Sequence, residues 1–191
     1  MKRNQESSSL PIARVAGGFY VLSVITGLSA LALGAHGLAS WENAANLAGT
    51  IGYLVVTVLF YFIFKPVNNL ISLLAALISF AGCAGWFLDN IHLPPLPVDS
   101  MALFGFYCLL IGYLILRSTF LPRILGVLMF IASAGWLTFL SPPLGKELFR
   151  FTKFTGLLGE GSLTLWLLFK GVNVARWKQQ ASRVPQPRGV N

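Results

Sequence analysis

One acidic residue, Glu160, falls inside a strongly apolar stretch of the sequence. An ionisable group in the hydrocarbon of a membrane usually faces the interior of a helix bundle and often marks a pathway, a proton relay or a binding site. Glu160 is therefore the leading candidate for chemistry. The alternative is a structural role, in which Glu160 is protonated or hydrogen-bonded to a neighbouring helix and Gly159 and Gly161 admit that neighbour closely.

Three other side chains lie at a depth similar to that of Glu160 when helical turns are counted along their segments. They are Tyr53, Cys83 and Tyr107. If these residues face the same interior, they converge with Glu160 on one outward-opening cavity, with Tyr107 as a partner of the carboxyl group. The sequence alone does not fix which face of its helix each one occupies.

A second polar group, His36, Asp89 and His92, is expected near the outer ends of two helices. Two histidines and a carboxylate can form a metal site or a general acid and base pair. However, the prolines that follow His92 predict the end of its helix. We therefore favour contact with headgroups or water, and predict neither a metal nor a cofactor.

The sequence contains no nucleophile triad, glycine-rich phosphate loop or redox pair. Cys83 and Cys108 both lie in apolar segments, without CxxC or metal-ligand spacing. The 19 glycines fit the close packing of transmembrane helices better than a nucleotide fingerprint. Enzymatic activity stays open, but the motifs favour a protein that is not an enzyme.

The composition indicates an integral membrane protein. Of the 191 residues, 55% are hydrophobic and 10% are charged, whereas about 25% of a typical globular chain is charged. The net charge of +8 does not indicate nucleic acid, because the basic residues lie mainly between and after apolar runs. The lipid bilayer is the expected partner, and the cell membrane the expected location.

Apolar runs of about 20 residues, the length that a membrane-spanning helix needs, predict an all-α bundle of six transmembrane helices in one domain, residues 12–175. Residues 37–45 are expected to form an exposed turn, and Lys65-Pro66 a tight turn that makes the second and third helices antiparallel neighbours. The six segments cover residues 12–35, 46–64, 67–88, 100–116, 122–140 and 154–172.

The basic residues predict that both termini are cytoplasmic. With that orientation, eleven of the 14 Lys and Arg residues fall on the cytoplasmic side, and only Lys146, Arg150 and Lys153 fall outside. Residues 1–11 are then a cytoplasmic tail, and residues 176–191 a basic cytoplasmic tail that is predicted to be disordered. Topology is enough to explain the basic residues, although some are candidates for binding anionic headgroups: Arg14, Lys65, Arg117 and Arg123.

Two long motifs carry a family resemblance: LLIGYLILRSTFLPRILGVLMFIASAGWL from Leu109 and GEGSLTLWLLFKGVNVARW from Gly159. Together with RVAG from Arg14 and KPVN from Lys65, they resemble a bacterial membrane family known as domain of unknown function 4386. The resemblance implies a multi-pass membrane protein without an assigned activity. Sequences of that family often carry His where this chain has Tyr107, so a histidine-based mechanism at that position does not transfer.

Three classes of function fit these features. A protein that binds or moves a small or lipid-like molecule in a cavity near Glu160 is the first, because six helices with a buried acid can form a gated cavity. An intramembrane enzyme acting on a lipid-soluble substrate is the second. An accessory or structural membrane subunit is the third, favoured if Glu160 is simply packed.

Overall fold

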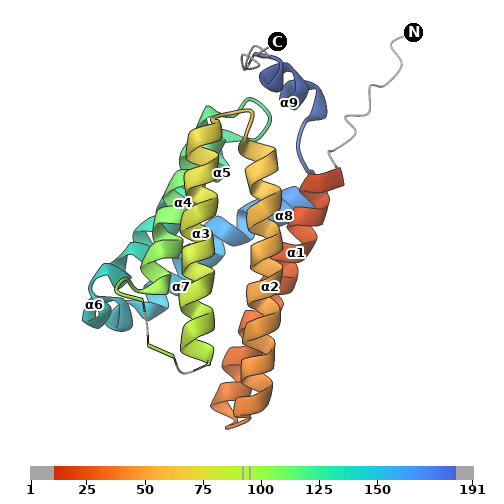
Figure 1. The fold of residues 1–191 in the computed structure, drawn as a ribbon. Coiled ribbons are helices and arrows are strands. Elements are labelled where there is room, and N and C mark those ends of the chain that lie inside the picture. The colour runs from red at the N-terminus through yellow and green to blue at the C-terminus, as the bar shows by residue number, and fades with distance from the viewer. Residues whose placement is uncertain (1–10, 92, 95, 184–191) are drawn as a thin grey trace, which may run out of the picture.

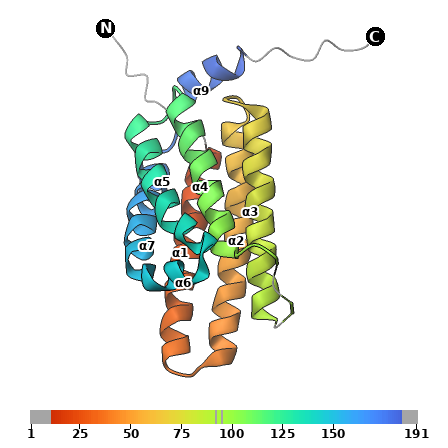
Figure 2. The same ribbon diagram turned by 90° about the vertical axis from the view of Figure 1, so that its left-hand side faces the viewer.

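The computed structural model describes residues 11–91, 93–94 and 96–183, and this part of the chain is helical without a strand. Four long helices come first, followed by a more broken second half (Figures 1 and 2). The elements are α1 (Pro11–Ala35), α2 (Ala39–Phe64), α3 (Asn69–Asn90), α4 (Ser100–Arg117), α5 (Arg123–Trp136), the 3₁₀ turn η1 (Leu137–Leu140), α6 (Pro142–Glu147), α7 (Phe149–Gly156), the π-helical segment η2 (Leu157–Gly161), α8 (Ser162–Phe169) and α9 (Val174–Ala181).

The surface of the bundle is apolar, as expected for a protein in lipid. Large apolar side chains are widely exposed, and Leu70 on α3 is 74% exposed. Several hydroxyl groups are instead buried, among them those of Thr57 and Ser79, whose oxygens lie 2.6 Å apart between α2 and α3. Five helices in the described chain are long and apolar enough to cross a membrane: α1, α2, α3, α4, and α5 extended through η1. This arrangement is that of a multi-pass membrane protein.

Consecutive helices form antiparallel hairpins, and small residues hold them together. In the α1–α2 hairpin, Gly52 lies against the Ser23 hydroxyl and Gly49 against that of Thr26. In the α4–α5 hairpin, Gly112 and Gly126 each lie against the other's carbonyl oxygen. Such close approach of backbones is the usual means of packing helices in a membrane. The predicted pairing of the second and third helices is confirmed, because α2 and α3 pack together.

Local capping explains several helix ends. The Asn68 side chain accepts a hydrogen bond from the Ile71 amide at the start of α3, and Asp99 accepts one from the Met101 amide at the start of α4. Both residue types are preferred at this position. The turns after α1 and α8 each use a glycine with a positive φ, Gly37 at 72° and Gly171 at 67°.

Three segment boundaries differ from those predicted. Helix α2 begins at Ala39, so the turn expected over residues 37–45 is much shorter. The last apolar helix starts at Phe149 rather than at residue 154, and ends at Phe169. Of the tail expected to be disordered from residue 176, residues 176–181 belong to α9 instead, and residues 184–191 lie outside the described chain.

Helix α9 is anchored to the end of the bundle at which α1 begins (Figure 1). The Trp177 indole nitrogen donates to the Ile63 carbonyl oxygen at 2.9 Å, which fixes α9 to the end of α2. The Gln180 side chain accepts from the Thr119 amide at 3.0 Å and donates to the Arg117 carbonyl oxygen at 3.3 Å. These bonds to backbone groups explain why a polar segment that sequence composition assigns to disorder is helical.

A cavity around Glu160

The chain carries Glu160 on a segment with π-helical geometry. Helices α7 and α8 are joined by η2 without a break, and Glu160 is the fourth of its five residues. A π segment adds one residue to a helical turn, and such segments are frequent at functional sites. Gly159 allows α5 to approach this segment closely, because a Cβ there would lie 2.7 Å from that of Ala132 and even closer to the Leu128 carbonyl oxygen. Helix α5 therefore packs directly on the backbone of η2.

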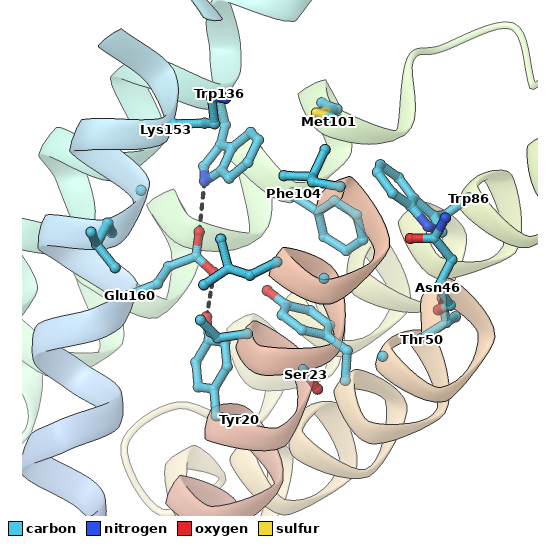
Figure 3. Close-up of a pocket in the computed structure, with 18 of the residues that line it drawn as sticks. Tyr20, Ser23, Asn46, Thr50, Trp86, Met101, Phe104, Trp136, Lys153 and Glu160 are labelled. Carbon is cyan, nitrogen blue, oxygen red and sulfur yellow. Dashed lines mark hydrogen bonds between the residues drawn. The ribbon is translucent and has the colours of Figure 1, made fainter. Parts of the chain in front are cut away.

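The Glu160 carboxyl group joins three helical elements (Figure 3). The Tyr20 hydroxyl, from α1, donates to Oε2 at 2.5 Å. The Trp136 indole nitrogen, from the end of α5, donates to Oε1 at 2.6 Å. The thiol of Cys108 on α4 is a further neighbour of the carboxyl group. Both carboxyl oxygens are thus held by neutral donors, and within the described residues no Lys or Arg forms an ion pair with Glu160.

The carboxyl group borders a cavity of about 400 Å³. Its walls come from α1, α2, α3, α4, α5, α7 and η2, so segments distant in sequence meet there (Figure 3). The lining residues are Tyr20, Ser23, Val24, Gly27, Leu28, Leu31, Asn46, Gly49, Thr50, Tyr53, Cys83, Trp86, Met101, Phe104, Trp136, Lys153, Gly156, Leu157, Glu160 and Gly161.

The cavity exists because α1 packs on only part of the continuous helix formed by α7, η2 and α8. Near its start, α1 packs tightly on α8, where a Cβ on Gly17 would lie 2.7 Å from the Leu168 backbone nitrogen. Further along, α1 makes at most slight contact with α7 among the described helices. Leu28 on α1 and Leu157 on η2, which border the resulting gap, are 61% and 66% exposed. The cavity therefore has an apolar opening on the side of the bundle.

The structure places three of the four predicted cavity residues on this cavity: Glu160, Tyr53 and Cys83. Tyr107 is fully buried and lies behind Tyr53, with their ring centroids 5.9 Å apart. No hydrogen bond joins Tyr107 to Glu160 in the described structure; the donors are Tyr20 and Trp136. Tyr20 lies inside an apolar run, and Trp136 has the position of an interfacial anchor near a segment end, so neither stands out in the sequence as a partner of Glu160. A tyrosine in the middle of a membrane helix was the available signal for Tyr20.

The outer polar group lies only partly within the described residues. His36 lies in the turn after α1, Asp89 lies in the last turn of α3, and His92 is outside the described residues. Among the described residues, no three His, Cys, Asp or Glu side chains are placed to hold a metal ion.

The four basic residues considered for headgroup binding lie at one end of the bundle, which is the end that carries α9. Arg14 is in the first turn of α1, Lys65 follows α2, and Arg117 and Arg123 flank the turn between α4 and α5. Figures 1 and 2 both show these segments together. Headgroup binding by these residues stays a prediction.

Comparisons with known proteins agree with the resemblance seen in the sequence. The family described as domain of unknown function (DUF4386) matches residues 100–171, which contain α4 to α8 and both Trp136 and Glu160. An uncharacterised protein of the archaeon Archaeoglobus fulgidus is 33% identical over 130 residues, which cover 62% of this chain and 76% of the archaeal one. No solved structure matches. The chain belongs to this family, DUF4386.

Proposed function

We propose that the chain crosses the cell membrane six times with both ends in the cytoplasm. The sixth passage is α7, η2 and α8, whose 21 residues from Phe149 to Phe169 extend for about 30 Å at 1.5 Å per residue. That length matches the hydrocarbon core of a bilayer. The excess of Lys and Arg at the end that carries α9 supports the orientation. The cavity then lies in the outer half of the membrane.

Cysteine labelling tests this orientation. In a background in which Cys83 and Cys108 are replaced by serine, Ser182→Cys after α9 should resist an impermeant thiol reagent in intact cells. Ser141→Cys, which is exposed at the opposite end of the bundle, should react. Permeabilised cells supply the control, because both positions should then be labelled. Labelling of Ser182→Cys alone in intact cells would reverse the orientation.

The function we propose is binding of a small, largely apolar molecule in the cavity at Glu160, as a carrier or a receptor. The observation that carries this proposal is that Glu160, the one acidic side chain among the described residues that line the cavity, sits in an otherwise mainly apolar space of about 400 Å³. Ligand sites have this character, with few polar groups in an apolar enclosure. A merely structural Glu160 would not need an open space beside it, which argues against an accessory subunit.

The same observation favours binding over intramembrane catalysis. Proton-transfer catalysis commonly uses a positioned acid or base within reach of the reacting group, assisted by a second group. Around the cavity, Glu160 is held by Tyr20 and Trp136, and an indole N–H does not exchange a proton in such chemistry. The cavity thus has the means to orient a ligand more clearly than the means to transform one.

Filling the cavity tests the proposal. Gly27 lines it, and a Cβ there would meet no atom within 4 Å. Gly27→Phe should therefore fold normally and exclude the ligand. Gly18→Phe is the matched control, since Gly18 is on the same helix, equally open and outside this cavity. Untargeted mass spectrometry of protein purified in mild detergent should find a small molecule with the wild type and Gly18→Phe.

That molecule should be absent, or at least about tenfold depleted, in Gly27→Phe, which is the loss expected when about 1.4 kcal/mol of binding is removed. Equal recovery from the two variants would contradict binding in this cavity. A wild-type preparation with no specifically bound molecule, compared with both variants, would also count against it.

A further inference from the structure

Five of the cavity-lining side chains are aromatic: Tyr20, Tyr53, Trp86, Phe104 and Trp136. Three of them form a connected wall, because the Tyr53 ring packs edge-to-face with Tyr20 at 5.4 Å and with Phe104 at 5.2 Å between centroids. Figure 3 shows Tyr20 and Trp136 on either side of the Glu160 carboxyl group. Aromatic rings around an anionic group are the means by which proteins recognise organic ammonium ions.

The charges in the cavity are arranged for a cation. Glu160 is acidic and has no ion-pair partner in the described structure, so a cation bound beside it would supply the counter-charge that favours its carboxylate form. The other charged lining residue, Lys153, lies two turns nearer the end of the bundle. Its ammonium group is placed over the Phe149 ring, 4.5 Å from the centroid, and it forms no ion pair with Glu160 among the described residues.

The cavity is also long. Along α1 it extends from Tyr20, beside the carboxyl group, to Leu31, a distance of about 16 Å at the helical rise per residue. Between these ends α1 contributes chiefly the apolar surface of Val24, Gly27 and Leu28. A ligand that fills this space has a polar group at the Glu160 end and an apolar body that points toward Leu31.

We infer that the ligand is a monovalent organic cation with an apolar body, such as an alkyl or aryl ammonium. This inference rests on the proposed function and adds the chemical class of the ligand. The ammonium group lies against the Glu160 carboxylate and the faces of neighbouring aromatic rings. In a desolvated site the attraction between a cation and these groups is much stronger than in water. The apolar body lies along α1.

A matched pair of probes tests the inference. Benzyltrimethylammonium carries the charge, and neopentylbenzene is its neutral isostere with carbon in place of nitrogen. Isothermal titration of the detergent-solubilised protein should show the cation binding to the wild type. Glu160→Gln should weaken cation binding by at least about tenfold. Binding of the neutral isostere should change by less than about threefold, the scatter expected when no charge is involved.

Glu147→Gln is the control variant. It removes one negative charge from an exposed position on α6, outside the cavity, so it should leave cation binding unchanged. Phe104→Leu gives a second test that retains the acid. This variant should weaken binding of the cation by several-fold while the isostere still binds, because an aromatic face is lost and an apolar wall is kept.

The outcomes separate the two proposals. If both probes bind the wild type equally and Glu160→Gln changes the binding of neither, the inferred cationic class of the ligand is wrong, whereas the proposal of binding in the cavity is retained. If neither probe binds, and Gly27→Phe and Gly18→Phe recover the same molecules, the cavity itself is not a binding site. Equal loss of cation binding in Glu147→Gln and Glu160→Gln would reduce the effect to surface charge and overturn the inference.

Discussion

Glu160→Leu should destabilise the protein by about 2 to 6 kcal/mol, because it leaves two hydrogen-bond donors without an acceptor, at about 1 to 3 kcal/mol each. The donors are the hydroxyl of Tyr20, which is 1% exposed, and the indole N–H of Trp136. The loss also removes the only side-chain hydrogen bonds that join α1 and α5 to η2 in the described structure. Thermal unfolding in detergent, followed by tryptophan fluorescence, measures the effect.

Glu160→Gln is the informative contrast. An indole N–H can only donate, so the glutamine oxygen must face Trp136 and the amide nitrogen must face Tyr20. The Tyr20 hydroxyl can rotate and accept from that nitrogen, since a phenol both donates and accepts. We therefore expect Glu160→Gln to retain most of the wild-type stability. If Gln and Leu destabilise the protein equally, the hydrogen bonds do not account for the position of Glu160.

The second large effect concerns the close contact between α5 and η2. Gly159→Ala should lower stability by about 1 to 3 kcal/mol, the usual cost of overpacking. The added methyl group would meet the Leu128 carbonyl oxygen and the Ala132 side chain, and a backbone neighbour cannot rotate away. The resulting displacement of α5 from η2 should also separate Glu160 from Trp136, so the tryptophan emission of the folded state should change.

Gly161→Ala is a control within the same π segment. A Cβ at Gly161 would meet only the Leu157 side chain, at 3.4 and 3.9 Å, which is ordinary contact. Alanine also favours helical structure over glycine, so this variant should be as stable as the wild type or slightly more so. Equal melting temperatures for Gly159→Ala and Gly161→Ala would show that α5 does not pack on η2 as described.

Hydropathy predicted the long helices because a membrane span must be apolar over most of its length. It failed where a helix continues beyond the apolar part. The start of α2 contains Trp41, Glu42 and Asn43, which a hydropathy criterion assigns to a turn. The Glu42 carboxyl group lies over Gly34 of α1, and a carboxylate near a helix start is favourable. The segment is therefore helical for reasons that local composition does not carry.

For the cavity, the sequence predicts the depth of a residue along its helix but not the face of the helix on which it lies. Counting turns placed Tyr53, Cys83 and Tyr107 level with Glu160, yet depth does not say which face of α4 meets η2. The structure turns Cys108 toward the carboxyl group and Tyr107 toward Tyr53. The contact between Tyr20 and Glu160 depends on the packing of α1 near η2, and these two residues are 140 positions apart in the sequence. Only tertiary packing brings them together, so the position of Tyr20 in a membrane helix could mark it as a candidate but not as the partner of Glu160.

The unequal helix lengths have a consequence for the surrounding lipid. Helices α1 and α2 contain 25 and 26 residues and extend for about 38 Å, and Figure 2 shows their hairpin reaching beyond the neighbouring elements. A bilayer that meets a long hairpin and a shorter last helix side by side must thicken against one or thin against the other. The cavity opening lies at this seam, so amphiphiles next to it are in locally strained membrane. Bilayer thickness should therefore influence how readily they leave the lipid for the protein.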